Sequence, residues 1–401
     1  MPQATPLLRL MNLLLTPGMR TRKDPDAVFD GILAEVQRDH APLTAQDLAA
    51  VDGLRLLLAD HAANPDLSGL GWMSAQDQIR DRLRNRAVVR SAQAQRPGVR
   101  DEPVTAPVFV VGLPRTGTTL TYNLVARHPG HRGPTLWEMT NLGLPLPEAE
   151  RAKVIEKTRK RFAAVGRLSP AWAHLHPLIA ESEEEDFMLR AHTEMFATWG
   201  PAPRYIDWVK GADLTDDFRF LREALQVIAA GEAPDRWVLK HPMDLWRTPE
   251  ILRAFPDARF VWTHRAPSSA VASGCSMSEA THTMYIKPGR IDLERIGREW
   301  LEISAGGVER AMALRDQLPA DAVIDVVYDD LVAEPETVVR GVFDRLGIDW
   351  TPADAANLAA ATDRTGHKPH SYTLERYGLD EDQVAKAFAA YEIPPSVLPR
   401  A

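Results

Sequence analysis

The segment from Gly112 to Thr119 (GLPRTGTT) constrains the fold of this chain more than any other stretch of its 401 residues. It follows a short apolar run, Val108–Val111, of the kind that forms a central strand buried on both faces. It leads into a helical pattern over Thr118–Arg127. Its glycines let the backbone wrap closely, so that several N–H groups and the positive end of the helix can face one anion. The sequence therefore predicts an anion-binding turn between a strand and a helix.

One position of this turn separates it from the loops of nucleotide hydrolases. The spacing fits G-x-x-x-x-G-[KT]-[ST], but Thr118 stands where ATPases and GTPases have lysine. A hydrolase needs that lysine on the terminal phosphates and usually has magnesium beside it. Here Arg115 is the cation within the loop. An ordinary ATPase or GTPase is therefore disfavoured.

Strand and helix patterns alternate after residue 106. This alternation predicts an α/β fold, with a P-loop-like parallel β-sheet flanked by helices and joined by right-handed crossovers. Ligands of such sheets bind outside the carboxyl ends of the strands. Further strands are expected at Trp237–Leu239, Arg259–Thr263 and Val323–Val327, and helices at Asp216–Ala230, Asp244–Ala254, Pro267–Ser278 and Leu293–Gln317.

The first 100 residues are predicted to form a helical N-terminal extension. Apolar residues recur at helical spacing in Asp26–Arg38, and Thr44 marks the start of a second helix expected over Asp47–Asp60. A basic run, Arg80–Arg100, precedes the change of pattern. We place the boundary there, with residues 1–100 as an extension packed on the core and residues 101–401 as the domain that carries the anion sites.

The apolar patch Leu7–Leu15 is too short to cross a membrane, which takes about 20 apolar residues. A cleaved signal peptide also fits badly, because no small-x-small cleavage site follows the patch. Two interpretations remain. The patch forms an amphipathic helix packed on the body of the protein, or an interfacial helix that makes peripheral membrane contact and helps to reach a lipid acceptor.

Composition narrows the classes of partner. A formal net charge of -8 argues against a nucleic-acid binder that works through a global basic field, but not against a local anion pocket. Cys275 is the one cysteine, so an intramolecular disulfide and a Cys-built zinc site are excluded. Low cysteine usage fits a reducing compartment, and a cytoplasmic location is expected. No metal-ligand cluster is visible in the sequence.

A second anion element follows the strand expected at Arg259–Thr263. Arg265 follows just after this strand, and Pro267 then begins a helix. Ser273 lies eight residues after Arg265, about two turns into that helix. An arginine at a helix start is a good bidentate phosphate ligand. Two phosphate sites at the ends of two parallel strands suit a nucleotide with phosphates on its 5′ and 3′ sides. One such nucleotide is 3′-phosphoadenosine-5′-phosphosulfate (PAPS).

These two elements resemble those of the PAPS-dependent sulfotransferase superfamily, in particular its bacterial branch. Residues 108–120 (VFVVGLPRTGTTL) resemble its 5′-phosphosulfate loop, and residues 257–277 (DARFVWTHRAPSSAVASGCSM) resemble its 3′-phosphate element. The resemblance runs from about residue 105 to residue 392. It implies that Arg115 and the N–H groups of Thr116, Gly117, Thr118 and Thr119 hold the 5′-phosphosulfate, and that Arg265 and Ser273 hold the 3′-phosphate.

The resemblance extends to residues outside the two elements. Tyr328 is similar to the tyrosine that lies beside the adenine, although a tyrosine of the core at a strand end is an equal interpretation. Lys240 is similar to the lysine that tyrosylprotein sulfotransferases place near the transferring sulfuryl group. The animal enzymes close on the 3′-phosphate with an Arg-Lys-Gly segment that this chain lacks, and Lys368 or Arg364 is expected in its place.

Sulfuryl transfer proceeds in line and is expected to need no metal. Charge builds on the oxygen that leaves towards the 5′-phosphate, where the loop N–H groups, Arg115 and Lys240 would stabilise it. The acceptor hydroxyl needs a general base. Glu138 is the first candidate, because it follows the loop and helix as in tyrosylprotein sulfotransferases, and His176 or His241 are the alternatives. The acidic run Glu183–Asp186 is interpreted as a solvated helix start.

The acceptor is expected to be a hydroxyl of a small-molecule or lipid-like alcohol, in a chain of bacterial origin. Tryptophans in the segments expected to build the acceptor pocket hint at an apolar acceptor, or are ordinary core residues: Trp137, Trp172, Trp199 and Trp208. Two other functions stay open, a phosphotransferase built on the same loop and a nucleotide-binding module without catalysis.

Overall fold

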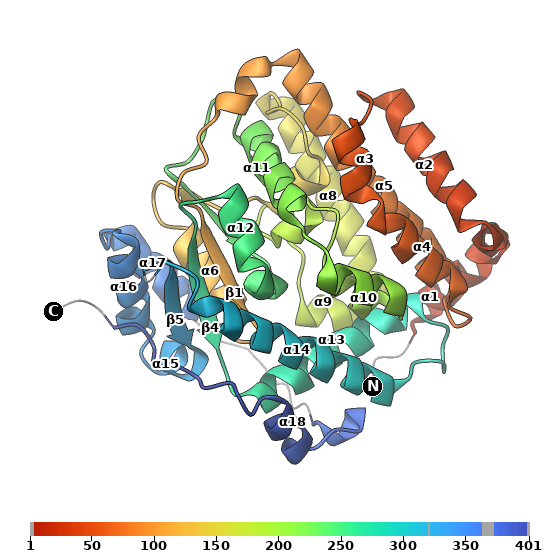
Figure 1. Ribbon diagram of the computed structural model, residues 1–401. Helices are drawn as coiled ribbons and strands as arrows, with labels where there is room; N and C mark the ends of the chain where they lie inside the picture. The colour runs from red at the N-terminus through yellow and green to blue at the C-terminus, as the bar shows by residue number, and fades with distance from the viewer. Residues whose placement is uncertain (1–3, 320, 363–372, 399–401) are drawn as a thin grey trace. The chain divides into compact units, whose positions relative to one another are not determined.

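The computed structural model describes residues 4–319, 321–362 and 373–398 (Figure 1). The chain forms two compact units that alternate along the sequence. The helical unit comprises Met1–Pro103, Thr135–Ala233 and Met277–Asp292, and the sheet unit comprises Val104–Pro134, Pro234–Ser276 and Leu293–Ala401. The boundary expected near residue 100 lies close to residue 103, where the chain first passes from the helical unit to the sheet unit. Residues 1–103 share their unit with two later segments.

The sheet unit is built on five parallel strands in the order β2-β3-β1-β4-β5. This confirms the predicted α/β fold with a parallel sheet. Strand β1 lies in the centre and is buried throughout, as its apolar run requires. The register pairs Val110 with Lys240, and Gly112 with Thr263, so these strands end at one edge of the sheet. The strands are β1 (Val108–Gly112), β2 (His131–Arg132), β3 (Arg236–Lys240), β4 (Arg259–His264) and β5 (Val323–Val327).

Helices join the strands and cover the sheet. Val110, Tyr122, Val261 and Phe343 belong to one buried cluster between the sheet and its helices. The helical segments of this unit are α6 (Thr118–Ala126), η5 (Pro242–Arg247), α12 (Thr248–Ala254), α14 (Leu293–Arg315), α15 (Tyr328–Ala333), α16 (Pro335–Leu346), α17 (Pro352–Thr362), η6 (Glu375–Tyr377) and α18 (Glu381–Ala387). Helix α13 (Pro267–Tyr285) begins in the sheet unit and ends in the helical unit.

Two helix predictions in this region were wrong at their ends. The segment predicted as one helix over Asp244–Ala254 is a 3₁₀ helix followed by α12, because Pro249 lacks an N–H group and favours the first turn of a new helix. Helix α13 continues past its predicted end at Ser278 to Tyr285. Residues 279–287 contain no proline or glycine that would end it.

The helical unit holds the N-terminal quarter of the chain and two later helical segments (Figure 1). The predicted helix Asp26–Arg38 is confirmed as α2. Its helical segments are α1 (Pro6–Leu15), η1 (Thr16–Lys23), α2 (Pro25–Asp39), α3 (Ala45–Val51), α4 (Gly53–Ala63), α5 (Gly69–Gln95), η2 (Pro97–Asp101), α7 (Leu136–Thr140), α8 (Glu148–Leu168), α9 (Pro170–Leu175), η3 (Asp186–Met188), η4 (Glu194–Trp199), α10 (Pro203–Gly211) and α11 (Thr215–Ala229).

The single helix predicted over Asp47–Asp60 is instead two helices, α3 and α4, which meet at Asp52. Helix α3 starts with a full capping box between Thr44 and Asp47. Helix α4 starts at Gly53, where a Cβ atom would lie 2.2 Å from the ring of Trp208. Because glycine has no Cβ, the ring of Trp208 packs directly on the backbone at this position.

The basic run Arg80–Arg100 lies mostly within the long helix α5, where its arginines form ion pairs. Arg86 is buried and lies 3.4 Å from Asp47, and Arg90 lies 2.7 Å from the same carboxylate. Burial alone would raise the pKa of Asp47, but hydrogen bonds from Arg90 and Thr44 and the charge of Arg90 lower it to about 2. These ion pairs connect α5 with α3. Among the described residues, no helix combines the length and apolarity that a membrane crossing needs.

Candidate active site

The loop between β1 and α6 is a tight turn with three left-handed residues. Gly112 has φ 146°, Arg115 has φ 71° and Gly117 has φ 92°. For Arg115, whose side chain carries a Cβ, this conformation costs about 1–2 kcal/mol. Such strain is found where a backbone is held for function. The N-terminus of α6 begins directly after Gly117, as the sequence predicted, so its N–H groups and dipole open on the loop.

A hydroxyl pair fixes this loop to the neighbouring strand. Thr116 Oγ1 donates to the carbonyl oxygen of Leu113 at 2.7 Å and lies 2.6 Å from Thr263 Oγ1 of β4. Both threonines are buried. Because its hydroxyl is already engaged in the protein, Thr116 supports the loop from beneath, and the N–H groups at the start of α6 are the part of the loop suited to an anion.

The two anion elements contact each other directly. Arg115 Nε donates to Ser273 Oγ at 3.1 Å, and Arg265 Nη1 donates to the carbonyl oxygen of Arg115 at 3.1 Å. Ser273 is buried on α13, two turns after Arg265, as its spacing predicted. The structure therefore brings a loop and a strand end, 150 residues apart in sequence, to one place.

The side chain of Tyr328 packs against the loop between β1 and α6. A Cβ atom on Gly117 would lie 2.8 Å from Tyr328 Cδ2, and the Arg265 guanidinium carbon lies 4.3 Å from the centre of the tyrosine ring. Tyr328 is half-buried at the start of α15, directly after β5. The ring is held between the loop backbone and a cation, a geometry that cation–π attraction favours.

Lys240 supplies a third cation to the loop. It ends β3, is 2% exposed, and its Nζ lies 3.5 Å from Thr119 Oγ1 and 5.9 Å from the Tyr122 ring centre. It reaches the N-terminal turn of α6 from the neighbouring strand. Together with Arg115 and Arg265, it makes the carboxyl edge of the sheet locally positive in a chain whose net charge is -8.

The candidate bases Glu138 and His241 belong to different units. Glu138, in the helical unit, closes a capping box at the start of α7: its Oε2 accepts from Thr135 N at 2.9 Å and from Thr135 Oγ1 at 2.8 Å. The spacing Thr-x-x-Glu is a sequence signal of this box, so the cap was predictable from the sequence. His241 is buried beside Lys240 in the sheet unit. Lys368 and Arg364 lie outside the described residues.

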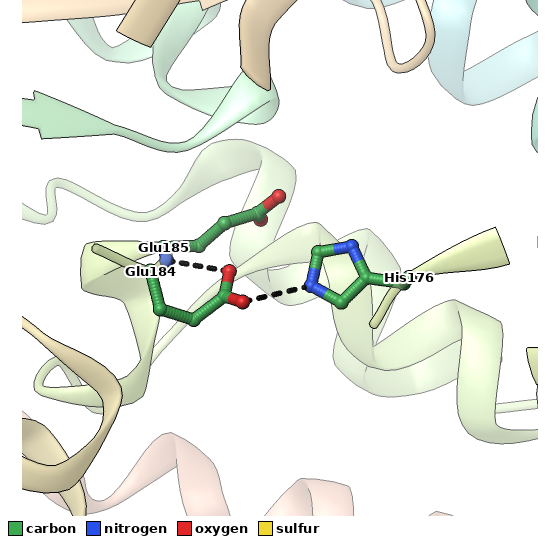
Figure 2. A group of neighbouring side chains, drawn as sticks. All are labelled: His176, Glu184 and Glu185. Carbon is green, nitrogen blue, oxygen red and sulfur yellow. Dashed lines mark hydrogen bonds and ion pairs between the residues drawn. The ribbon is translucent and has the colours of Figure 1, made fainter. Parts of the chain in front are cut away.

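His176 belongs to a cluster in the helical unit (Figure 2). Its Nε2 lies 3.2 Å from Glu184 Oε2, and the backbone N–H of Glu185 donates to Glu184 Oε1 at 2.8 Å. Possible ligand atoms of these three residues lie within 4.8 Å of one another, a spacing that could hold a metal ion. This cluster was not predicted from the sequence, because His176 and the glutamates are joined by a loop whose path no local pattern fixes.

The interpretation of Glu183–Asp186 as a solvated helix start was wrong about the solvent, although the 3₁₀ helix η3 does begin at Asp186. Glu184 and Glu185 are each 7% exposed, and Asp186 is 0% exposed with Arg190 Nε 3.2 Å from its Oδ1. Glu183 forms an isolated bridge with Thr135. An arginine partner, a histidine and the backbone N–H of Glu185 lower the cost of burying these carboxylates.

A cavity of about 340 Å³ opens in the helical unit between α8 and the segment that carries His176. Its wall is mainly apolar. The residues that line it are Arg159, Phe162, Ala163, Gly166, Trp172, Ala173, Pro177, Leu178, Ile179, Ala180 and Glu181. Trp172 lines the cavity and its ring centre lies 5.7 Å from that of His176.

The fold and the loop together define a P-loop-like α/β protein with an anion site at the carboxyl edge of a parallel sheet. Comparison with known proteins shows to which family this P-loop-like protein belongs. The sequence pattern of the sulfotransferase family matches residues 107–352, so the chain belongs to the sulfotransferase family. This range includes both anion elements.

Two solved structures are similar to this one over nearly their whole length. Sulfotransferase STF1 from Mycobacterium tuberculosis H37Rv is 27% identical, with a TM-score of 0.78, over 90% of this chain and 98% of that one. Sulfotransferase STF9 from Mycobacterium avium shares the fold at 23% identity, with a TM-score of 0.80, over 94% and 98% of the two chains. Comparison with curated protein sequences gave no match. The predicted membership of the bacterial branch is confirmed.

Proposed function

We propose that this sulfotransferase uses PAPS as its donor and transfers the sulfuryl group to an alcohol. In this proposal the N–H groups of Thr116–Thr119 and Arg115 bind the 5′-phosphosulfate, and Arg265 with Ser273 binds the 3′-phosphate. The observation that carries the proposal is the direct contact of the two anion elements through Arg115 and Ser273. A ligand with two separate anionic groups on one nucleoside fits such a pair of neighbouring sites.

Tyr328 would lie beside the adenine in this arrangement. Its ring is half-buried against Gly117 and Arg265. A flat aromatic surface next to the phosphate loop suits a nucleobase. This position supports the role beside the nucleotide over that of an ordinary core tyrosine.

Lys240 and Arg115 would stabilise the transition state. During in-line transfer, the sulfur–oxygen bond to the 5′-phosphate breaks while a bond to the acceptor oxygen forms, and negative charge grows on the oxygen that leaves. Fixed donors aimed at that charge lower the barrier because they need no reorganisation. Lys240 is held by burial near the first turn of α6, which supports this role. All these groups belong to the protein, so transfer should continue in the presence of a chelator.

Glu138 remains our first proposal for the base that takes the acceptor proton. Its capping role complicates the usual test, because Glu138→Ala would remove both a base and a helix cap. Glu138→Gln separates the two, since glutamine serves equally in a capping box but does not take up a proton. We expect Glu138→Gln to lower kcat by about a hundredfold or more while the melting temperature is unchanged. Full activity of this variant would assign Glu138 to the cap alone.

His176 is the second proposal, and its contact with Glu184 supports it. A carboxylate that accepts from one ring nitrogen orients the ring and leaves the basic lone pair on the other nitrogen. If His176 is the base, His176→Gln abolishes turnover and Glu184→Gln lowers it partly, whereas Glu138→Gln has little effect. The same His176→Gln variant removes one potential ligand of the cluster, so a chelator control distinguishes a base from a metal ligand.

The acceptor would be a small or lipid-like alcohol, and the apolar cavity along α8 and Trp172 supports an apolar one. We propose the cytoplasm as the compartment, a location that the single, buried cysteine supports. The test is release of 3′-phosphoadenosine-5′-phosphate (PAP) from PAPS, measured with a panel of phenols, sterols and long-chain alcohols. Acceptor-dependent release without added magnesium supports the proposal. Release of ADP from ATP with magnesium would favour the phosphotransferase.

A further inference from the structure

Helix α1 presents a stripe of exposed leucines that the proposed catalytic function does not use. Leu7 is 45% exposed, Leu10 53%, Leu13 70% and Leu14 68%. Among the described residues, ten large hydrophobic side chains are exposed, and these four lie on one ten-residue helix. Isolated exposed leucines are ordinary on protein surfaces, but a contiguous group marks an interaction site.

The spacing places the four leucines on one side of the helix. Leu7, Leu10 and Leu14 follow at intervals of three and four residues, and Leu13 is three residues after Leu10. At 3.6 residues per turn they cover an arc of about 120° along a helix about 15 Å long. The side chains of Leu8 and Asn12 project from the opposite side. The stripe is therefore a continuous apolar face and not scattered exposure.

The opposite face of α1 is fixed to the helical unit. Leu8 is 0% exposed, and Asn12 Oδ1 accepts from the backbone N–H of Leu70 at 2.8 Å, at the start of α5. The following turn, η1, is held as well, because Trp72 Nε1 donates to Thr21 Oγ1 at 2.9 Å. The inner face therefore fits the interpretation of a helix packed on the body of the protein, and the outer face leaves the interfacial interpretation open. These contacts hold the helix with its four exposed leucines on the outer side.

The charge around the stripe identifies its partner. The first 23 residues contain Arg9, Arg20, Arg22 and Lys23 and no acidic residue, although the whole chain has 55 acidic and 47 basic residues. Arg9, Arg20 and Lys23 are exposed. On the helical wheel, Arg9 directly borders the leucine arc. A basic margin beside an apolar face suits a bilayer that contains anionic lipids, where leucines enter the acyl boundary and cations meet the headgroups. A two-fold dimer through the same stripe would instead bring the basic margins of two copies together, where their like charges repel.

We propose that α1 binds this protein peripherally to the surface of an anionic membrane through Leu7, Leu10, Leu13 and Leu14. The inference stands apart from the chemistry of the site, since it uses no residue of the anion elements. It would bring the enzyme to the surface where alcohols with long apolar chains are found.

Vesicle flotation of the full-length protein tests this proposal. The probes are vesicles of phosphatidylcholine alone and of phosphatidylcholine mixed with phosphatidylglycerol. We expect flotation with the mixed vesicles and a loss of at least about tenfold in the partition coefficient of the triple variant Leu10→Gln/Leu13→Gln/Leu14→Gln. The double variant Arg9→Gln/Lys23→Gln should weaken binding to the mixed vesicles by about fivefold per charge, and less at high salt.

Leu48→Gln is the matched control, because Leu48 is a leucine of the same unit with 37% exposure on α3. It should float as the unchanged protein does. Circular dichroism and PAP binding show that each variant is folded. The proposal is overturned if the unchanged protein floats with neither kind of vesicle, or if the triple variant floats equally well. A concentration-dependent dimer that the triple variant abolishes, without flotation, would also overturn it and assign the stripe to a second copy.

Discussion

Replacement of Gly117 by alanine tests whether the phosphate loop and Tyr328 are packed as the structure has them. Gly117 has φ 92°, a left-handed conformation that costs a residue with a Cβ about 1–2 kcal/mol. In addition, the new Cβ would lie 2.8 Å from Tyr328 Cδ2, closer than side-chain carbons approach. The ring must move by several tenths of an ångström, away from its position against Arg265. We add about 1 kcal/mol for that shift and expect a total loss of about 2–3 kcal/mol.

Denaturant unfolding followed by tryptophan fluorescence measures this loss, provided that the slope of the transition is unchanged. Gly306→Ala is the matched control in the same unit: it lies on the exposed side of α14, and no atom lies within 4 Å of its Cβ position. This control should gain about 0.5–1 kcal/mol, as glycine-to-alanine changes in helices do.

The double variant Gly117→Ala/Tyr328→Ala separates the two contributions. Without the ring, the steric part of the penalty disappears and the backbone part remains. In the Tyr328→Ala background, the Gly117→Ala change should therefore cost about 1–2 kcal/mol. The reasoning is refuted if Gly117→Ala is as harmless as Gly306→Ala, or if its cost is the same with and without the tyrosine.

Three further predictions concern catalysis, acid stability and the thiol. Lys240→Met should lower kcat roughly a hundredfold or more while the dissociation constant of PAP changes little, because PAP lacks the sulfuryl group; steady-state kinetics and titration calorimetry check this, and a matching loss of PAP affinity would contradict it. The pKa of Asp47 is lowered to about 2, so its ionised form stabilises the fold fully above about pH 4 and this contribution is lost as the pH falls towards 2. Asp47→Asn should therefore cost about 2 kcal/mol near neutral pH, with a gap to the unchanged protein that narrows in acid; a constant gap in unfolding curves taken across that range would count against the ion pair with Arg90. Burial raises the pKa of Cys275 to about 12, and iodoacetamide should label this thiol only after unfolding, as mass spectrometry would show.

The strands of the sheet unit were predictable because they depend on local signals. Val108–Val111 and Val323–Val327 are short apolar runs between loops, and both became strands at those positions. Helix ends were less predictable where packing decided them. Gly53 is itself a weak point in the helical pattern, but its packing against Trp208, 155 residues away, depends on the tertiary fold.

The anion elements were predictable as motifs, but their meeting was not. Each motif depends on residues within about ten positions, whereas the hydrogen bond of Arg115 to Ser273 joins residues 158 apart. The burial of Glu184 and Asp186 was missed for a similar reason. A run of acidic residues is usually solvated, and only the fold shows the histidine and the arginine that compensate it. The cap at Glu138 was the opposite case, since the Thr-x-x-Glu spacing was present in the sequence.

The central claim is that the two neighbouring anion elements bind one nucleotide with phosphates on both sides. Calorimetric titration with PAP, with ATP as the control and without magnesium, tests it most directly. We predict micromolar binding of PAP, a loss of about ten- to a hundredfold in Arg265→Ala, and much weaker binding of ATP. Arg298→Ala, which removes an exposed arginine of α14, should bind PAP as the unchanged protein does. Equal or tighter binding of ATP, or no binding of either nucleotide, would contradict the account.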